Sequence, residues 1–85
     1  MTKLGTYMRE LRQGKELSTY EAGKAAGCSP TVFSLVERGK RGVSIPMLWR
    51  LISALDGDFH YALTLMVLDA GVPPEAVRTA SHPNN

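Results

Sequence analysis

The chain has 85 residues, of which 44% are hydrophobic and 21% are charged, and its formal net charge is +2. This length fits one domain with a modest core, and no apolar run approaches the ~20 residues of a membrane span. A single cysteine excludes an internal disulfide or a multi-cysteine zinc site, and no signal sequence, nucleophile–base pair or metal-ligand array is visible. We therefore expect a cytoplasmic protein that is not an enzyme and has no metal, no cofactor and no membrane contact.

The charge is distributed unevenly along the chain. Residues 1–50 carry nine Lys/Arg against four Asp/Glu, whereas residues 51–85 carry one against four. A basic half would attract phosphate, although an ordinary solvated surface can have the same charge distribution. The charge pattern therefore favours a nucleic-acid partner only if a motif supports it.

Serine or threonine stands before four of five predicted helices, where a side-chain oxygen can accept a free backbone N–H. These predicted caps are Thr2, Ser18, Ser29 and Ser44. Apolar residues then recur at helical spacing, and a proline in the first turn supports the third and fourth helices. The predicted helices cover residues of about 3–14, 19–26, 30–38, 45–55 and 59–70.

The third predicted helix has two unlike faces. At about 100° per residue, Phe33 and Val36 fall on one face, and Glu37 lies near them, where a carboxylate needs a partner. The opposite face carries small and mixed side chains, which are Thr31, Ser34, Leu35 and Arg38. Gly27 suits a tight turn between the second and third helices. Two short helices joined in this way form a helix-turn-helix pattern at 18–38, whose outer face is expected to enter the major groove of DNA.

The fifth predicted helix is apolar on two sides. Phe59, Ala62, Leu63 and Met66 mark one face, and Tyr61, Leu65 and Leu68 mark the opposite one. One face would cover the core and the other would bind a second subunit, so the helix at 59–70 is the expected dimerisation element. Alternatively, the tail covers the second face through Val72 and Val77. The domain is expected to span 1–72, followed by a partly disordered tail at 73–85.

Three segments then make the sequence recognisable: Leu4 to Arg12, Ser18 to Ser29, and Phe33 to Arg41 with its run Glu-Arg-Gly-Lys-Arg. Together they resemble the phage-repressor/Cro-type family, also called the xenobiotic-response-element type, over residues of about 3–56. The resemblance implies an all-α fold: a compact five-helix repressor-like DNA-binding domain that contains the helix-turn-helix.

The resemblance also implies roles for individual residues. The base-contacting positions are Pro30, Thr31, Ser34 and Leu35, with Val32 at the margin. The phosphate-contacting positions are Thr19, Ser29, Arg38, Lys40 and Arg41, although a merely solvated loop at 38–41 remains the alternative. Arg12 and Glu37 match a mostly buried ion pair of the family, and independent surface charges are the alternative for them.

The expected function is binding of a pseudo-palindromic double-stranded DNA operator by a homodimeric transcription regulator, a repressor of the Cro or phage-immunity kind. No Arg, Gln or Asn faces outward on the third helix before Arg38, so thymine-methyl contacts, hydroxyl groups and DNA shape must supply specificity. One alternative is an antitoxin that autoregulates its operon and binds a toxin through its C-terminal part. A second alternative is a protein-interaction adaptor that has lost DNA binding.

Overall fold

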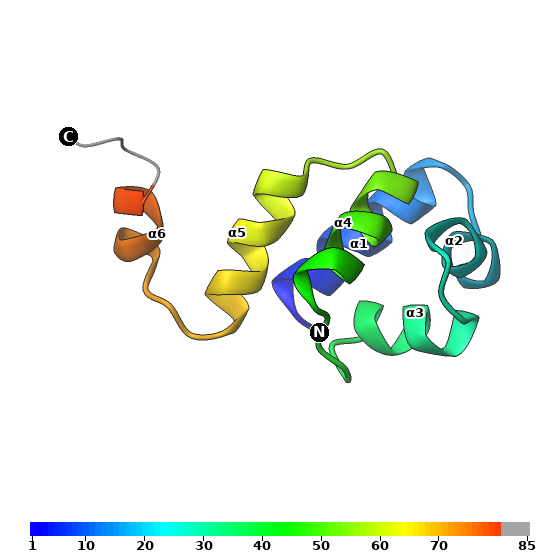
Figure 1. Ribbon diagram of the computed structural model, residues 1–85, viewed down its shortest axis with the longest axis horizontal. Helices are drawn as coiled ribbons and strands as arrows, with labels where there is room; N and C mark the ends of the chain where they lie inside the picture. The colour runs from blue at the N-terminus through cyan, green and yellow to red at the C-terminus, as the bar shows by residue number, and fades with distance from the viewer. Residues whose placement is uncertain (81–85) are drawn as a thin grey trace.

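The computed structural model describes residues 1–80, and its secondary structure consists of α-helices and turns, as predicted (Figure 1). The helices are α1 Lys3–Gly14, α2 Thr19–Ala26, α3 Pro30–Glu37, α4 Ile45–Ala54, α5 Phe59–Asp69 and α6 Pro74–Ala80. The first five lie where the sequence placed them. The predicted all-α five-helix fold is thus confirmed, and the tail adds a further helix, α6, that the sequence analysis did not predict. The disorder expected at the end of the tail falls on residues 81–85, which lie outside the described residues.

The predicted caps explain where the helices begin. Thr2 Oγ1 accepts the Gly5 N–H at 2.9 Å, and Ser29 Oγ accepts the Val32 N–H at 3.1 Å. Each bond satisfies one of the free donors in a first helical turn, which contributes about 0.5–2 kcal/mol. The same geometry opens the other helices, through Ser18 for α2, Ser44 for α4 and Asp58 for α5.

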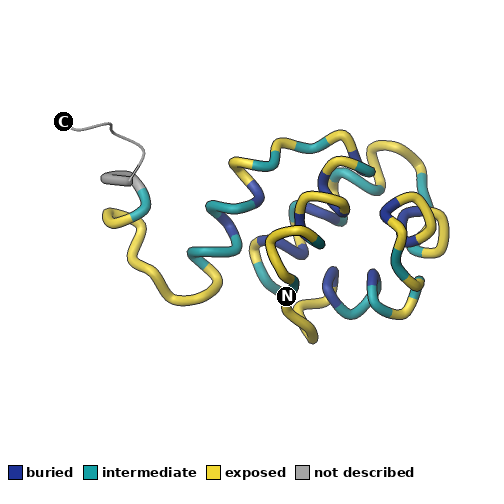
Figure 2. Tube along the Cα trace, in the orientation of Figure 1, coloured by how far each residue is buried: buried dark blue, intermediate teal, exposed yellow. Residues whose placement is uncertain are grey.

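The core lies between α1, α2, α3, α4 and α5, whose inner sides are buried in Figure 2. Its largest fully buried side chains are Phe33, Met8, Leu48, Leu51, Ile52 and Leu55. Phe33 sits in this cluster with Ala22 and Ala26, so a large side chain of α3 packs beside the small ones of α2. The apolar stripe of α3 is therefore fixed inward, and its polar face is left for the surface.

A glycine sets the angle between α2 and α3. A side chain at Gly23 would meet the Pro30 Cα and the Ser29 carbonyl oxygen, both at 3.2 Å from its Cβ. The backbone of the turn thus lies directly on α2. Gly27, with φ +75°, ends α2 in the left-handed conformation that glycine adopts without a steric penalty. These two glycines place the start of α3 against α2.

The dimerisation face predicted on α5 needs a correction. Leu65 is 8% exposed and belongs to the core, so it does not lie on an outer face with Tyr61 and Leu68. Tyr61 is half exposed and packs edge-on against Tyr7, with the ring centroids 4.8 Å apart. Leu68 is half-buried. Only Tyr61 and Leu68 of the three therefore remain accessible in the single chain.

Helix α6 packs beside α5 and stands apart from α1 to α4 in Figure 1. A groove of about 460 Å³ separates the two helices, and its lining is mostly apolar. The lining residues are His60, Leu63, Thr64, Val67, Val72, Ala76 and Val77. The tail thus approaches α5 through Val72 and Val77 but leaves Val72 38% exposed. Within residues 1–80, every helix is too short or too polar to cross a membrane.

Candidate nucleic-acid interface

Helix α3 lies at the edge of the molecule, with α1 and α2 packed against its inner side (Figure 1). Its outer face carries the four predicted base-contacting residues. Thr31 is exposed, while Pro30, Ser34 and Leu35 are half-buried. Ser29 caps the helix, and its hydroxyl, having accepted the Val32 N–H, can still donate its proton to another acceptor. This face offers hydroxyl groups and small apolar surfaces to a groove.

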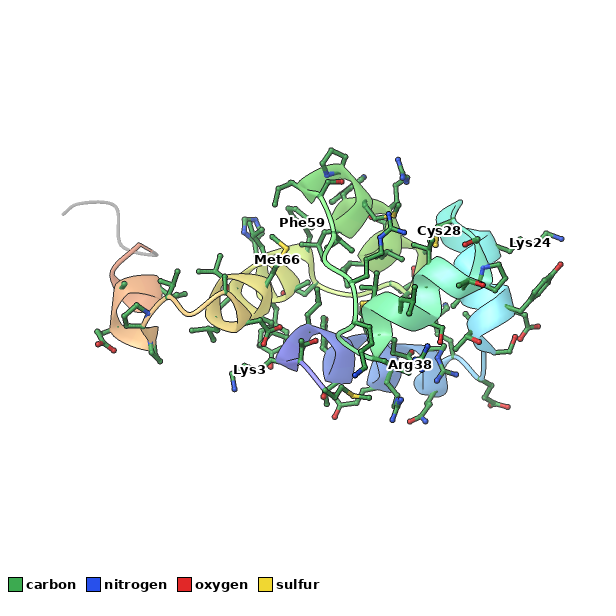
Figure 3. The ribbon with its side chains drawn as sticks, turned by 90° about the horizontal axis from the view of Figure 1, so that it is seen from below. Lys3, Lys24, Cys28, Arg38, Phe59 and Met66 are labelled. Carbon is green, nitrogen blue, oxygen red and sulfur yellow. The ribbon has the colours of Figure 1, made fainter. Side chains whose placement is uncertain are left out.

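A basic loop, residues 38–42, follows α3 directly. Arg38, Lys40 and Arg41 are all exposed, and Figure 3, which views the molecule from the side of α3, shows this loop and Arg38 on that side. The loop is tied to the end of α3 because the Lys40 N–H donates to the Leu35 carbonyl at 2.8 Å. Three cations are thus held beside the C-terminal end of the helix, where they also complement its dipole.

The start of α2 carries Thr19, which the sequence analysis assigned to a phosphate contact. Ser18 and Glu21 form a reciprocal capping box, at 2.8 and 3.0 Å. The hydrogen bonds from the Ser18 backbone and side chain lower the pKa of Glu21 below its usual value. Thr19, which is half-buried, is the first helical residue, and N–H groups in a first turn have no acceptor within their own helix. The Glu21 carboxylate already lies at this helix start, so the contact of Thr19 with phosphate stays a prediction.

A buried ion pair joins α1 to α3. Arg12 Nε donates to Glu37 Oε2 at 2.8 Å, and Arg12 Nη2 donates to Glu37 Oε1 at 3.1 Å. The side chains are 15% and 3% exposed, respectively. The hydrogen bond that Arg12 donates to the Glu37 carboxylate raises the pKa of Arg12 above its ordinary value. Because Arg12 also donates to the Leu17 carbonyl at 2.9 Å, it fixes the α1–α2 turn and the end of α3 together.

A second arginine of α1, Arg9, also lies close to the Glu37 carboxylate. Arg9 Nε lies 3.6 Å from Glu37 Oε1, although the Arg9 side chain remains 41% exposed. Residues three apart on a helix lie on the same side, so the Arg9–Arg12 spacing was the available sequence signal. The sequence analysis did not predict the Arg9–Glu37 contact, because the family resemblance assigned only Arg12 to Glu37. The carboxylate therefore lies between two guanidinium groups of α1.

A family model described as "Helix-turn-helix domain" matches residues 3–58, which include α1 to α4 and the basic loop after α3. The chain belongs to the helix-turn-helix domain family. It is also similar to the crystal structure of the clp gene regulator ClgR from Corynebacterium glutamicum, with 31% identity and a TM-score of 0.66. That match covers 95% of this chain and 92% of ClgR. Comparison with curated proteins gives no match.

Membership of this family makes the protein a DNA-binding helix-turn-helix protein of the transcription-regulator class. In this fold the second helix of the unit lies in the major groove while the first crosses the backbone. Here these helices are α3 and α2, and both present their polar surfaces outward. The Arg12–Glu37 ion pair and the capping bonds of α2 and α3 form within the protein itself, so they fix the position of that surface without DNA.

Proposed function

We propose that this protein binds a specific double-stranded DNA operator as a homodimer and acts as a cytoplasmic transcription repressor of the Cro or phage-immunity kind. The observation that carries the proposal is the outer face of α3, on which Thr31 is exposed and Ser34 and Leu35 are half-buried, with the exposed cations of the basic loop at its end. Residues Thr31, Ser34 and Leu35 would face base edges, with Pro30 at the entry. Thr19, Ser29, Arg38, Lys40 and Arg41 would contact phosphate.

The chemistry of α3 indicates how sequence would be recognised. Thr31 and Ser34 can exchange hydroxyl hydrogen bonds with base edges, and the methyl groups of Thr31 and Leu35 suit the thymine methyl group. No bidentate side chain stands on this face within α3 itself. We therefore expect part of the specificity to come from groove shape and DNA deformability.

A homodimer would match two such faces to two half-sites. The apolar side chains that α5 and α6 leave partly exposed, among them Leu68 and Val72, support a subunit interface there. In a two-fold dimer, the copies of α3 would enter successive major grooves, so the half-site centres would lie about 10–10.5 base pairs apart. Selection from random duplex DNA tests this spacing directly, since a recovered palindrome with another spacing contradicts the arrangement.

The basic loop should supply much of the affinity through phosphate contacts. Lys40→Ala/Arg41→Ala is expected to weaken binding to all duplexes and to reduce the slope of log K against log salt by about 1.8, because two released counterions are lost. Fluorescence anisotropy at several salt concentrations measures both quantities. The fold should persist, because both side chains are exposed.

A matched variant controls for the loss of net charge. Lys15→Ala/Arg50→Ala removes the same two formal charges, but Lys15 pairs with Asp56 at 2.6 Å and Arg50 donates to Met47 Sδ on the exposed side of α4. This variant should retain most of the salt dependence of the wild type. If both double variants lose the same slope, the loop at 38–42 has no special role and the proposed interface is wrong.

A further inference from the structure

The C-terminal residue of α5 is hydrogen-bonded to the first turn of α1. Asp69 Oδ1 accepts the Lys3 N–H at 2.9 Å, and Asp69 Oδ2 accepts the Leu4 N–H at 3.0 Å. Figure 3 shows Lys3 at this junction of α1 with α5. One carboxylate thus satisfies two donors that have no acceptor within α1. Sixty-six positions separate Asp69 from Lys3, so this contact depends entirely on the tertiary fold.

The position of Asp69 is unfavourable for its own helix. A carboxylate at a helix C-terminus faces the negative end of the dipole, whereas the same group at an N-terminus is stabilised. Asp69 is the last residue of α5 but lies against the N-terminus of α1. Its electrostatic role is therefore in the junction between the two helices.

The first turn of α1 in turn contacts both parts of the proposed DNA-binding surface. A Cβ at Gly39 would lie 2.8 Å from Thr2 Cγ2, so the basic loop packs directly on the cap of α1. A Cβ at Gly5 would collide with the carbonyl oxygen of Glu37, the last residue of α3. Displacing this first turn would therefore displace the end of α3 and the loop after it.

The basic loop and α5 line a common groove beside the start of α1. A groove of about 340 Å³ runs between Gly39 to Val43 on one side and Met66, Asp69 and Ala70 on the other. Thr2 and Leu4 line the same groove. The contacts named above therefore link α5 to the loop through the start of α1.

We propose that Asp69 is a positioning residue for DNA binding: by holding the first turn of α1, it fixes the basic loop and the end of α3 relative to α5. This inference rests on the proposed function for its effect on DNA. If α5 joins the subunits, Asp69 also sets how each subunit's DNA-contacting surface is held relative to the dimer interface. It touches no DNA in this arrangement.

Two variants separate positioning from charge. Asp69→Asn keeps the shape but turns an NH₂ group toward one of the two N–H donors, and Asp69→Ala removes both acceptors. Each variant removes one negative charge, which by itself would strengthen binding to DNA equally in both. Positioning predicts the reverse: operator affinity falls by about threefold for Asn and about tenfold for Ala, because binding must then reorder a first turn of α1 that one and two hydrogen bonds no longer hold. Fluorescence anisotropy with the selected operator measures this order.

Amide hydrogen exchange gives a second readout that requires no DNA. Asp69→Ala should speed exchange at both Lys3 and Leu4, and Asp69→Asn at the one of them that faces the NH₂ group. Both variants should also speed exchange at Gly39 and Lys40 in the basic loop. Glu10→Gln, which removes an exposed carboxylate elsewhere on α1, should leave loop exchange unchanged and should not weaken operator binding. Circular dichroism and sedimentation establish that the helices and the oligomeric state match the wild type.

The outcomes distinguish this inference from the proposed function. Tighter binding, or equal binding, in both Asp69 variants overturns the positioning role while the wild type still binds its operator. If the wild type binds no duplex, the proposed function fails, and loop exchange alone decides the positioning role. Faster exchange confined to Lys3 and Leu4 then contradicts it, and faster exchange that reaches Gly39 and Lys40 supports it.

Discussion

Glu37→Gln is expected to destabilise the folded domain by ~3–5 kcal/mol, because removing one partner of a buried pair leaves the other without compensation. The carboxylate is 3% exposed and accepts two hydrogen bonds from Arg12. Glutamine keeps the volume but brings an NH₂ group against a guanidinium that can only donate. Since 1 kcal/mol shifts the melting temperature of a domain of this size by ~4–8 °C, the midpoint should fall by well over ~10 °C.

Two controls make this measurement decisive. Glu10→Gln makes the same chemical change at an exposed site of α1 and should leave the melting temperature within ~2 °C of the wild type. The double variant Arg12→Met/Glu37→Leu removes both charges and should recover much of the loss, as replacing a whole buried pair by apolar residues often does. A Glu37→Gln midpoint equal to that of the wild type would mean that the pair contributes nothing to stability.

The helix starts were predictable because they depend on local chemistry. A serine or threonine oxygen reaches an N–H two or three residues onward, whatever the rest of the chain does. Thr2, Ser18, Ser29 and Ser44 therefore identified four helix starts without tertiary information. The inward face of α3 was equally predictable, since Phe33 and Val36 share one stripe and α3 has no competing stripe of large side chains.

Helix α5 shows why other features could not be predicted. Ala62, Leu65, Met66 and Asp69 recur at helical spacing, and so do Phe59, Ala62, Leu63 and Met66. When a helix is apolar nearly all round, spacing alone does not decide which stripe faces inward. The packing of α1 on α5 decides it, burying Leu65 and bringing Asp69 onto the start of α1.

The candidate site likewise has features that the sequence predicts and features that it does not. The residues of the proposed DNA-binding surface on α3 and the loop after it are consecutive in the chain, so they could be assigned from one segment. The contacts that support it are long-range, because Arg9, Arg12 and Asp69 reach α3 or its surroundings across 25 residues or more. A sequence read by periodicity identifies the surface of a helix but does not identify which distant side chains hold that helix in position.

Leu68→Glu is expected to have the largest effect on operator binding. Leu68 is half-buried on α5, so a carboxylate there should be tolerated by the single chain but should repel its counterpart across a two-fold interface. Monomers must bind each half-site separately, and the loss of linkage should reduce affinity for the full operator by about 10²–10⁴-fold. Sedimentation equilibrium measures the assembly, and gel shift on full and half operators measures the binding.

Leu65→Glu cannot serve for this test, because Leu65 is part of the core and a buried carboxylate would unfold the domain. Ser53→Glu is the matched control, since it adds the same charge at an exposed position of α4 and should leave both assembly and affinity unchanged. Half-operator binding by Leu68→Glu should equal that of the wild type, because the basic loop and α3 are unaltered. A Leu68→Glu protein that still sediments as a dimer would place the subunit interface away from this part of α5.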